Sequence, residues 1–139
     1  MFFRVEPPAV AVFSTPDRNA WGAVPASIIR ARAQVDPPLP GQPGPFSLGD
    51  PGRLEGLLRA AGFAAPEAHL LPAAHRAGSA AEYLQVAREA FGGFNAMMAH
   101  LPYRECESVW DQVQAALRRF ESPAGFEASG ECLVVAATK

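Results

Sequence analysis

The sequence predicts a single domain of the α/β class, with elements in the order β, α, α, β, α, α, β. Three observations lead to this prediction. Two short apolar runs, at residues 8–15 and 131–138, are typical of buried strands. Two amphipathic segments begin with helix-capping residues, Asp50 and Ser79. With 139 residues, of which 49% are hydrophobic and 19% charged, residues 1–139 have the length and composition of one globular domain.

The first strand and the first helix are expected near the start of the chain. Residues 8–15, "PAVAVFST", are bounded by prolines and predict a strand that is buried on both faces. After the turn "PDRNAW" we expect a helix over Ala20–Ala33, with one apolar stripe made by Trp21, Val24, Ile28 and Ala31. Pro25 lies inside this segment, so the alternative is that it marks the helix's first turn.

A loop and a well-marked second helix follow. Residues 36–52 contain six prolines and four glycines, which no regular element tolerates. Asp50 is placed as an N-cap and Pro51 as the first helical residue, where its missing N–H has no cost. Gly62 is the expected stop. The apolar positions follow the i, i+3, i+4, i+7 pattern of an amphipathic helix and are Leu54, Leu57, Leu58 and Ala61.

The next strand and helix are predicted over residues 65–91. Residues 65–78 indicate a strand that is broken or bulged near Pro72, and therefore lies at a sheet edge. Ser79 and Glu82 have the spacing of a capping box, which begins a helix. The apolar face of that helix is made by Tyr83, Leu84, Ala87 and Phe91.

The C-terminal part contains one long helix and the last strand. After a break and a short apolar turn, a helix is expected from about Glu105 to Phe120, and "SPAGF" ends it. Its inward side chains are Val109, Val113, Ala116, Leu117 and Phe120. Residues 131–138, "ECLVVAAT", are apolar nearly throughout, which favours a central strand.

Charge and composition argue against several classes of function. A net charge of −2 and a pI near 5.9 provide no positive field for nucleic acid. Cys106 and Cys132 match no metal-ligand spacing, so no metal site is predicted. Charged residues and prolines come too early for a signal peptide, and no apolar run spans a membrane. We therefore expect a cytoplasmic protein that binds neither nucleic acid nor membranes.

Three stretches together resemble a known family. "STPDRNAW", "PFSLGDPGRLEGLLRAAGF" and "ECLVVAATK" are similar to the C-terminal half of class I SAM-dependent methyltransferases, of the ubiquinone and menaquinone biosynthesis type. The resemblance covers residues 9–139. It implies a partial Rossmann-like sheet with a helical insertion between its last two strands. The strands would be Ala9–Ser14, Glu67–His75 and Glu131–Thr138, with the last one antiparallel and in the middle.

The same resemblance shows what the sequence lacks. The family binds SAM with a glycine-rich turn after its first strand and an acidic residue after its second, and no GxGxG run is present here. "FGGFNA", at 91–96, follows a predicted helix rather than a strand. The chain begins where the fifth strand of the family would lie. We therefore assign no catalytic and no cofactor-binding residue, and expect no cofactor for this chain alone.

The residues expected to line a substrate pocket are aromatic and methionine side chains. They correspond to the family's substrate-side loop and helical insertion, and they are Trp21, Phe46, Phe94, Met97 and Met98. The alternative is that they pack in the core or in a subunit contact. The histidines have no ligand spacing, and the helical carboxylates are interpreted as solvated surface.

The first strand would lie at a sheet edge, where its usual neighbour is missing. This edge is uncharged, so we expect it to be covered by the same strand of a second copy, which gives a homodimer with a continuous six-stranded sheet. The residues of that edge are Ala9, Val10, Ala11, Val12 and Phe13. Two hypotheses for function remain open. One is the substrate-side half of a methyltransferase, with SAM bound by a second chain. The other is a non-enzymatic module that binds a small apolar ligand or another protein.

Overall fold

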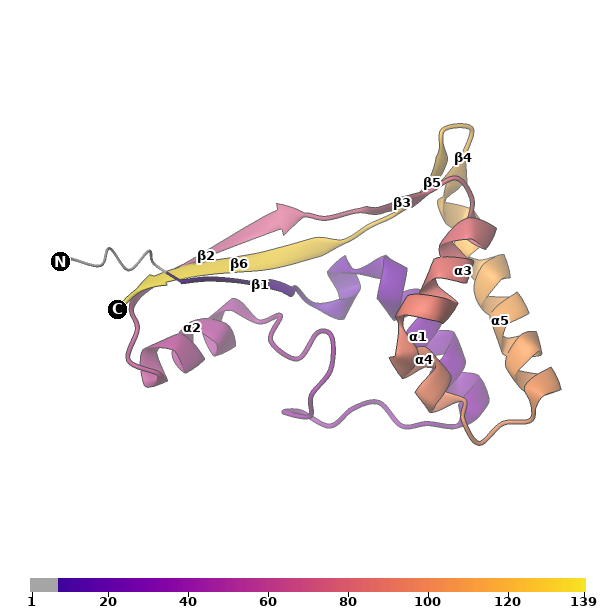
Figure 1. Ribbon diagram of the computed structural model, residues 1–139, viewed down its shortest axis with the longest axis horizontal. Helices are drawn as coiled ribbons and strands as arrows, with labels where there is room; N and C mark the ends of the chain where they lie inside the picture. Colours follow the sequence, from indigo (N-terminus) through magenta and orange to yellow (C-terminus); the bar gives the residue numbers. More distant parts are fainter. Residues whose placement is uncertain (1–7) are drawn as a thin grey trace.

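Two small antiparallel sheets and a group of helices make up residues 8–139, the part of the chain that this computed structural model describes (Figure 1). The first sheet has the order β1-β6-β2, from β1 (Ala9–Phe13), β6 (Glu131–Thr138) and β2 (Ala64–Pro72). The second has the order β3-β5-β4, from β3 (His75–Ala77), β5 (Gly125–Ala128) and β4 (Glu121–Ser122). All strand pairs of the described residues are antiparallel. Helices and sheets together make the fold mixed α/β.

One long ribbon joins the two sheets. The pair β2/β6 continues into the pair β3/β5, and the Ala73 N–H donates to the Gly130 carbonyl at 2.8 Å where they meet. In Figure 1 this ribbon runs from the end with β1 and α2 (Pro51–Ala60) toward the helical end. The helical end therefore depends on strand pairing between segments that are far apart in sequence.

The remaining helices pack together at the other end of the molecule (Figure 1). They are α1 (Ala20–Ala33), α3 (Ala80–Ala90), α4 (Gly92–Met97) and α5 (Tyr103–Leu117), with 3₁₀ turns η1 (Pro16–Arg18) and η2 (Arg118–Phe120). Ile29, Val109 and Val113 are completely buried at the centre of this group. In the described part of the chain, no helix has the length and apolarity needed to cross a membrane.

Helix α2 covers one face of the first sheet. Leu54 of α2 packs against Leu133 and Val135 of β6, and all three are buried. Paired residues in a sheet share a face, so Val10 and Val12 of β1, which pair with Val135 and Leu133, lie under α2 as well. The middle position of β6 agrees with its apolar sequence.

Both expected helix starts are confirmed by their hydrogen bonds. Asp50 Oδ1 accepts from the Arg53 N–H at 2.8 Å, and Ser79 Oγ accepts from the Glu82 N–H at 3.1 Å. The Glu82 carboxylate in turn accepts from the Gly78 N–H at 2.9 Å. Each cap satisfies donors that a helix N-terminus otherwise leaves free.

Pro25 lies inside α1 and does not mark its first turn. Proline has no N–H, so the Trp21 carbonyl four residues earlier loses its helical donor. The Tyr83 hydroxyl of α3 donates to that carbonyl at 2.8 Å in a buried position. The helix continues through Pro25 because a neighbouring helix supplies the missing hydrogen bond.

The break predicted near Pro72 and the edge position of this strand are confirmed. β2 lies at the edge of the first sheet and ends at Pro72, and the chain resumes as β3. A further irregularity of register falls between Ala64 and Glu67.

Four details differ from the sequence-based prediction. β1 is not buried on both faces, because Ala9 and Ala11 are exposed and the strand lies at a sheet edge. In α1, Ala31 of the predicted apolar stripe is exposed, and Ile29 and Ala33 are buried instead. Helix α5 begins at Tyr103 and ends at Leu117, followed by the turn η2. The segment after it forms the β4/β5 hairpin, which pairs with β3. These strands of two to four residues are too short to show a periodic pattern.

Candidate functional site

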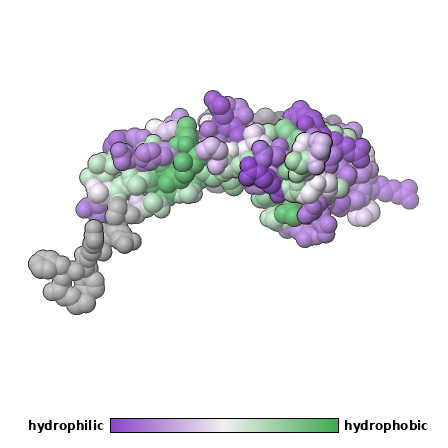
Figure 2. Space-filling model, turned by 90° about the horizontal axis from the view of Figure 1, so that it is seen from above, coloured by the Kyte–Doolittle hydropathy of each residue, from purple (hydrophilic) through white to green (hydrophobic). Residues whose placement is uncertain are grey.

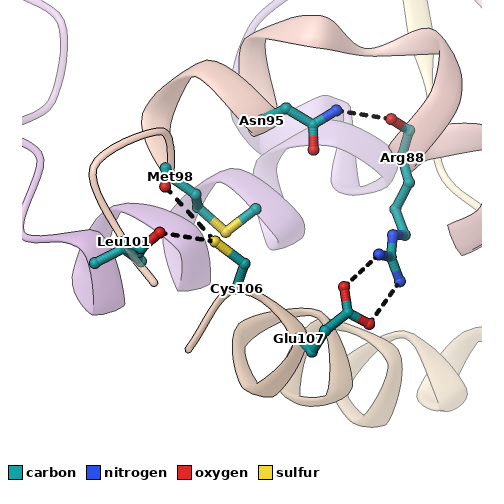
Figure 3. A network of polar contacts seen from close by, with 6 residues as sticks. All are labelled: Arg88, Asn95, Met98, Leu101, Cys106 and Glu107. Atoms are coloured by element: carbon teal, nitrogen blue, oxygen red, sulfur yellow. Dashed lines mark hydrogen bonds and ion pairs between the residues drawn. The ribbon is translucent and has the colours of Figure 1, made fainter. Parts of the chain in front are cut away.

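A shallow hollow of about 370 Å³ lies on the helical end, between α3, α4 and the start of α5 (Figure 3). Its size is at the lower limit for a site that holds a small molecule. The floor is formed by Met98, which is 2% exposed, and Trp110, which is 3% exposed. Tyr103 stands at its rim and is 77% exposed. The other lining residues are Arg88, Asn95, Ala99, Leu101, Cys106 and Glu107.

An ion pair borders the polar side of the hollow. The Arg88 guanidinium donates to both carboxylate oxygens of Glu107, at 2.5 and 3.3 Å, and lies over the Trp110 ring at 5.4 Å from its centroid. Asn95 Nδ2 donates to the Arg88 carbonyl at 2.8 Å and joins α4 to α3 (Figure 3). Since more than a third of both charged side chains is exposed, the pair contributes at most about 1 kcal/mol to stability. It does, however, hold α3 and α5 at a defined separation.

The Cys106 thiol lies on the apolar side. Its Sγ is 3.6 Å from the Met98 carbonyl and 3.7 Å from the Leu101 carbonyl, which are weak contacts for a thiol donor (Figure 3). No histidine or lysine is among the lining residues, and the one lining carboxylate, Glu107, is paired with Arg88, so no unpaired general base lies beside the thiol. The arrangement is suited to binding an apolar or aromatic molecule rather than to acid–base catalysis.

A second group of aromatic side chains fills the junction between the sheets and the helices. The ring centroid of Trp21 lies 4.7 Å from that of Phe13 and 5.1 Å from that of Phe91. Trp21 also stacks on His75, with the two ring centroids 4.3 Å apart. Burial lowers the pKa of His75 below its usual value, and its Nδ1 has no hydrogen-bond partner within residues 8–139. This group packs β1, α1 and β3 together.

Asn19 positions this junction, and the sequence analysis did not single it out. The side chain is completely buried and makes four hydrogen bonds. Its Nδ2 donates to Ser14 Oγ at 3.2 Å and to the Thr15 carbonyl at 2.9 Å. Its Oδ1 accepts from Trp21 Nε1 and from the Glu131 N–H, both at 3.0 Å. The only available signal was its place in "STPDRNAW", between a predicted strand and a predicted helix.

The structure separates the five predicted pocket residues. Met98 lines the hollow, and Phe94 lies beside it, with its ring 6.2 Å from that of Trp110. Trp21 and Phe46 lie in the aromatic group between the sheets and the helices, with their ring centroids 5.9 Å apart. The fifth residue, Met97, is half-buried against the helical core. A ligand in the hollow would therefore touch one of the five directly.

The histidines lie apart from one another and from the hollow. His69 is exposed on β2, His75 is in the aromatic junction, and His100 Nε2 is 3.0 Å from the Ala33 carbonyl. Within residues 8–139 no three histidine, cysteine, aspartate or glutamate side chains are grouped closely enough to hold a metal ion.

No run of two or more glycines follows a strand in the described residues. The chain leaves β1 through Ser14 and Thr15 into η1 without a glycine. A single glycine, Gly78, lies between β3 and α3, and its N–H donates to the Glu82 carboxylate. Gly92 and Gly93 begin the short helix α4, which follows α3 rather than a strand. The dinucleotide-binding fingerprint, by comparison, has several glycines directly after a strand, where they allow close approach.

Comparison with known protein families and with curated proteins finds no match to this chain.

Proposed function

We propose that the chain is the substrate-side half of a SAM-dependent methyltransferase, with SAM bound by a separate unit. The observation that carries this proposal is the first sheet: β6 runs antiparallel between β1 and β2, and β1 pairs with β6 alone among the described strands. This is the order that the resemblance of "STPDRNAW" and "ECLVVAATK" implies for the end of a partial Rossmann-like sheet. In that sheet the neighbour of β1 would belong to the cofactor-binding half.

In this proposal the hollow between α3, α4 and α5 holds the methyl acceptor. Methyl transfer from a sulfonium depends mainly on alignment of the two reactants, so a site without a general base is compatible with it. The floor of Met98 and Trp110 provides apolar and aromatic contact for a flat molecule. The Arg88–Glu107 pair and Asn95 keep the three helices in place around it.

Calorimetric titration tests the cofactor part of the proposal. The purified chain should give no heat of SAM binding at SAM concentrations up to about 1 mM, which means that any Kd is weaker than about 1 mM. It should form a complex with an isolated SAM-binding half of a class I methyltransferase, and that complex should bind SAM. Micromolar SAM binding by the chain alone, or no complex with the SAM-binding half, would contradict the proposal.

The acceptor site is tested separately with an aromatic probe. We expect 1-naphthol to raise the melting temperature of the chain and to quench its tryptophan fluorescence, because Trp110 lies in the floor of the hollow. Tyr103→Ala should weaken probe binding several-fold without lowering stability, because that side chain is 77% exposed at the rim. Leu39→Ala is the matched control, since Leu39 is 68% exposed and lies outside the hollow.

The hollow also supports the second candidate, a binding module without enzymatic activity. Support for this candidate comes from the lining, whose carboxylate Glu107 is paired with Arg88, and from the glycines Gly92 and Gly93, which follow a helix rather than a strand. This candidate predicts that 1-naphthol binds while the SAM-binding half neither forms a complex nor confers methyl transfer. Both candidates therefore predict that 1-naphthol binds. Only the methyltransferase candidate predicts a complex with the SAM-binding half.

A further inference from the structure

One side of β1 is paired with β6, and no other strand of residues 8–139 pairs with its other side. The Ala137 N–H donates to the Pro8 carbonyl at 3.1 Å, and the Ser14 N–H donates to the Glu131 carbonyl at 3.0 Å. Backbone groups alternate in direction along a strand, so residues 8, 10, 12 and 14 point toward β6. The N–H and C=O groups of Ala9 and Ala11 therefore point away from the sheet, and both residues are exposed.

The opposite edge, formed by β2, carries features that oppose strand addition. The Ala73 N–H donates to Gly130, on the side of β6. Because backbone groups alternate in direction along a strand, the backbone polar groups of Ala68, Leu70 and Pro72 face the opposite side, away from the sheet. Pro72 has no N–H to donate, and the register is irregular between Ala64 and Glu67. Figure 2 shows hydrophobic side chains over part of this surface. Leu70 and Leu71 of β2 are half exposed.

β1 has none of these features. Ala9–Phe13 contains no proline and no charged residue, and its register with β6 is continuous. One segment limits access to it: Gly49 lies so close to the Ser14 and Phe13 carbonyls that a Cβ there would overlap the backbone of Ser14. The accessible part of the edge is therefore Ala9 to Val12.

We propose that β1 pairs antiparallel with β1 of a second copy of this chain, around a two-fold axis at Val10. In this register Ala9 faces Ala11 of the other copy, and each of the two pairs exchanges two backbone hydrogen bonds. The result is a six-stranded sheet in the order β2-β6-β1-β1-β6-β2. On the face covered by α2, the two Val10 side chains meet across the axis and extend the apolar layer of Val12 and Val135.

The chemistry of the edge favours a second copy as the occupant. The edge is uncharged, so two copies meet without like-charge repulsion, and a two-fold axis makes its donors and acceptors self-complementary.

The dimer does not depend on the methyltransferase proposal. A SAM-binding half that adds a strand to β1 would compete with the second copy for the same edge. The homodimer would then form when the SAM-binding half is absent. Binding of the SAM-binding half to β1 would replace the second copy and give a heterodimer.

Light scattering after size exclusion tests the dimer. At about 100 µM the chain should elute with twice its mass of 14.8 kDa. Ala11→Pro removes an outward N–H from each copy and leaves the bonds to β6 intact, so two of four hydrogen bonds are lost and Kd rises about 10- to 30-fold. Ala9→Lys should raise the Kd of the dimer, because it places two lysines near each other across the interface. Ala68→Pro is the matched control. It removes an outward N–H from the β2 edge and should leave the Kd of the dimer unchanged.

Circular dichroism checks that each variant is folded. A wild-type chain that stays monomeric at about 100 µM, well above a micromolar Kd, overturns the proposal. So does a dimer that Ala11→Pro and Ala9→Lys leave intact but Ala68→Pro weakens, since the interface would then lie at β2. As a second measurement, Val10→Cys should form an intermolecular disulfide on mild oxidation, because the two side chains face each other at the axis.

Discussion

Removing the side chain of Asn19 should cost more stability than any other polar substitution at the junction. Its amide joins three elements, because its partners are the segment after β1, Trp21 of α1 and the first residue of β6. Asn19→Ala leaves the Trp21 Nε1–H and the Glu131 N–H without acceptors among the described residues, in a position that is fully buried. The Ser14 hydroxyl can rotate to another partner and adds little.

The magnitude follows from these orphaned groups. Each buried donor left without an acceptor costs about 1–3 kcal/mol, and a water molecule that enters the polar space recovers part of this. We therefore expect a net loss of about 3–4 kcal/mol in the free energy of unfolding. With a urea m-value of about 2 kcal/mol/M, the midpoint falls by about 2 M.

Urea denaturation followed by circular dichroism measures this loss. Asn95→Ala is the matched control, since Asn95 donates one hydrogen bond, to the Arg88 carbonyl, in an exposed position. It should cost about 0.5–1 kcal/mol. The reasoning is refuted if Asn19→Ala loses less than about 1 kcal/mol, or no more than the control does.

Three further predictions concern packing and pH. Gly49→Ala should destabilise the fold by several kcal/mol, because the new Cβ overlaps backbone just after β1, whereas Gly44→Ala, with open space around it, should be nearly neutral in the same urea titration. Tyr83→Phe should cost about 1–2 kcal/mol, because the Trp21 carbonyl loses its donor; burial also raises the pKa of Tyr83, so wild-type stability should fall as pH rises above about 10, and the variant should lack this fall. Burial lowers the pKa of His75, so stability present at neutral pH should be lost as pH falls below about 6.5, and melting curves of His75→Gln should show a smaller loss.

The helix boundaries were predictable where local chemistry sets them. Asp50 and Ser79 cap their helices with side-chain oxygens that accept from an N–H three residues ahead. The span Ala20–Ala33 also agrees with the prediction. The role of Pro25 was not predictable, because it depends on a hydroxyl that Tyr83 supplies from another helix.

The candidate site was predictable to a small degree. Met98 was named from the sequence and lines the hollow, whereas Arg88, Cys106 and Glu107 were not named as lining residues. Arg88 and Glu107 are nineteen residues apart, and their contact exists because α3 and α5 pack side by side. No periodicity in the sequence encodes which faces of two helices meet.

The sequence by itself determined the strands β1 and β6, the caps of α2 and α3, and the apolar middle position of β6, since each follows from neighbouring residues or from a run of one polarity. The tertiary structure decided the second sheet, the buried hydrogen bonds of Asn19, the hollow beside Trp110 and the open edge of β1. These features arise where distant segments meet, and their energy comes from pairing, burial and hydrogen bonds between residues that share no local pattern.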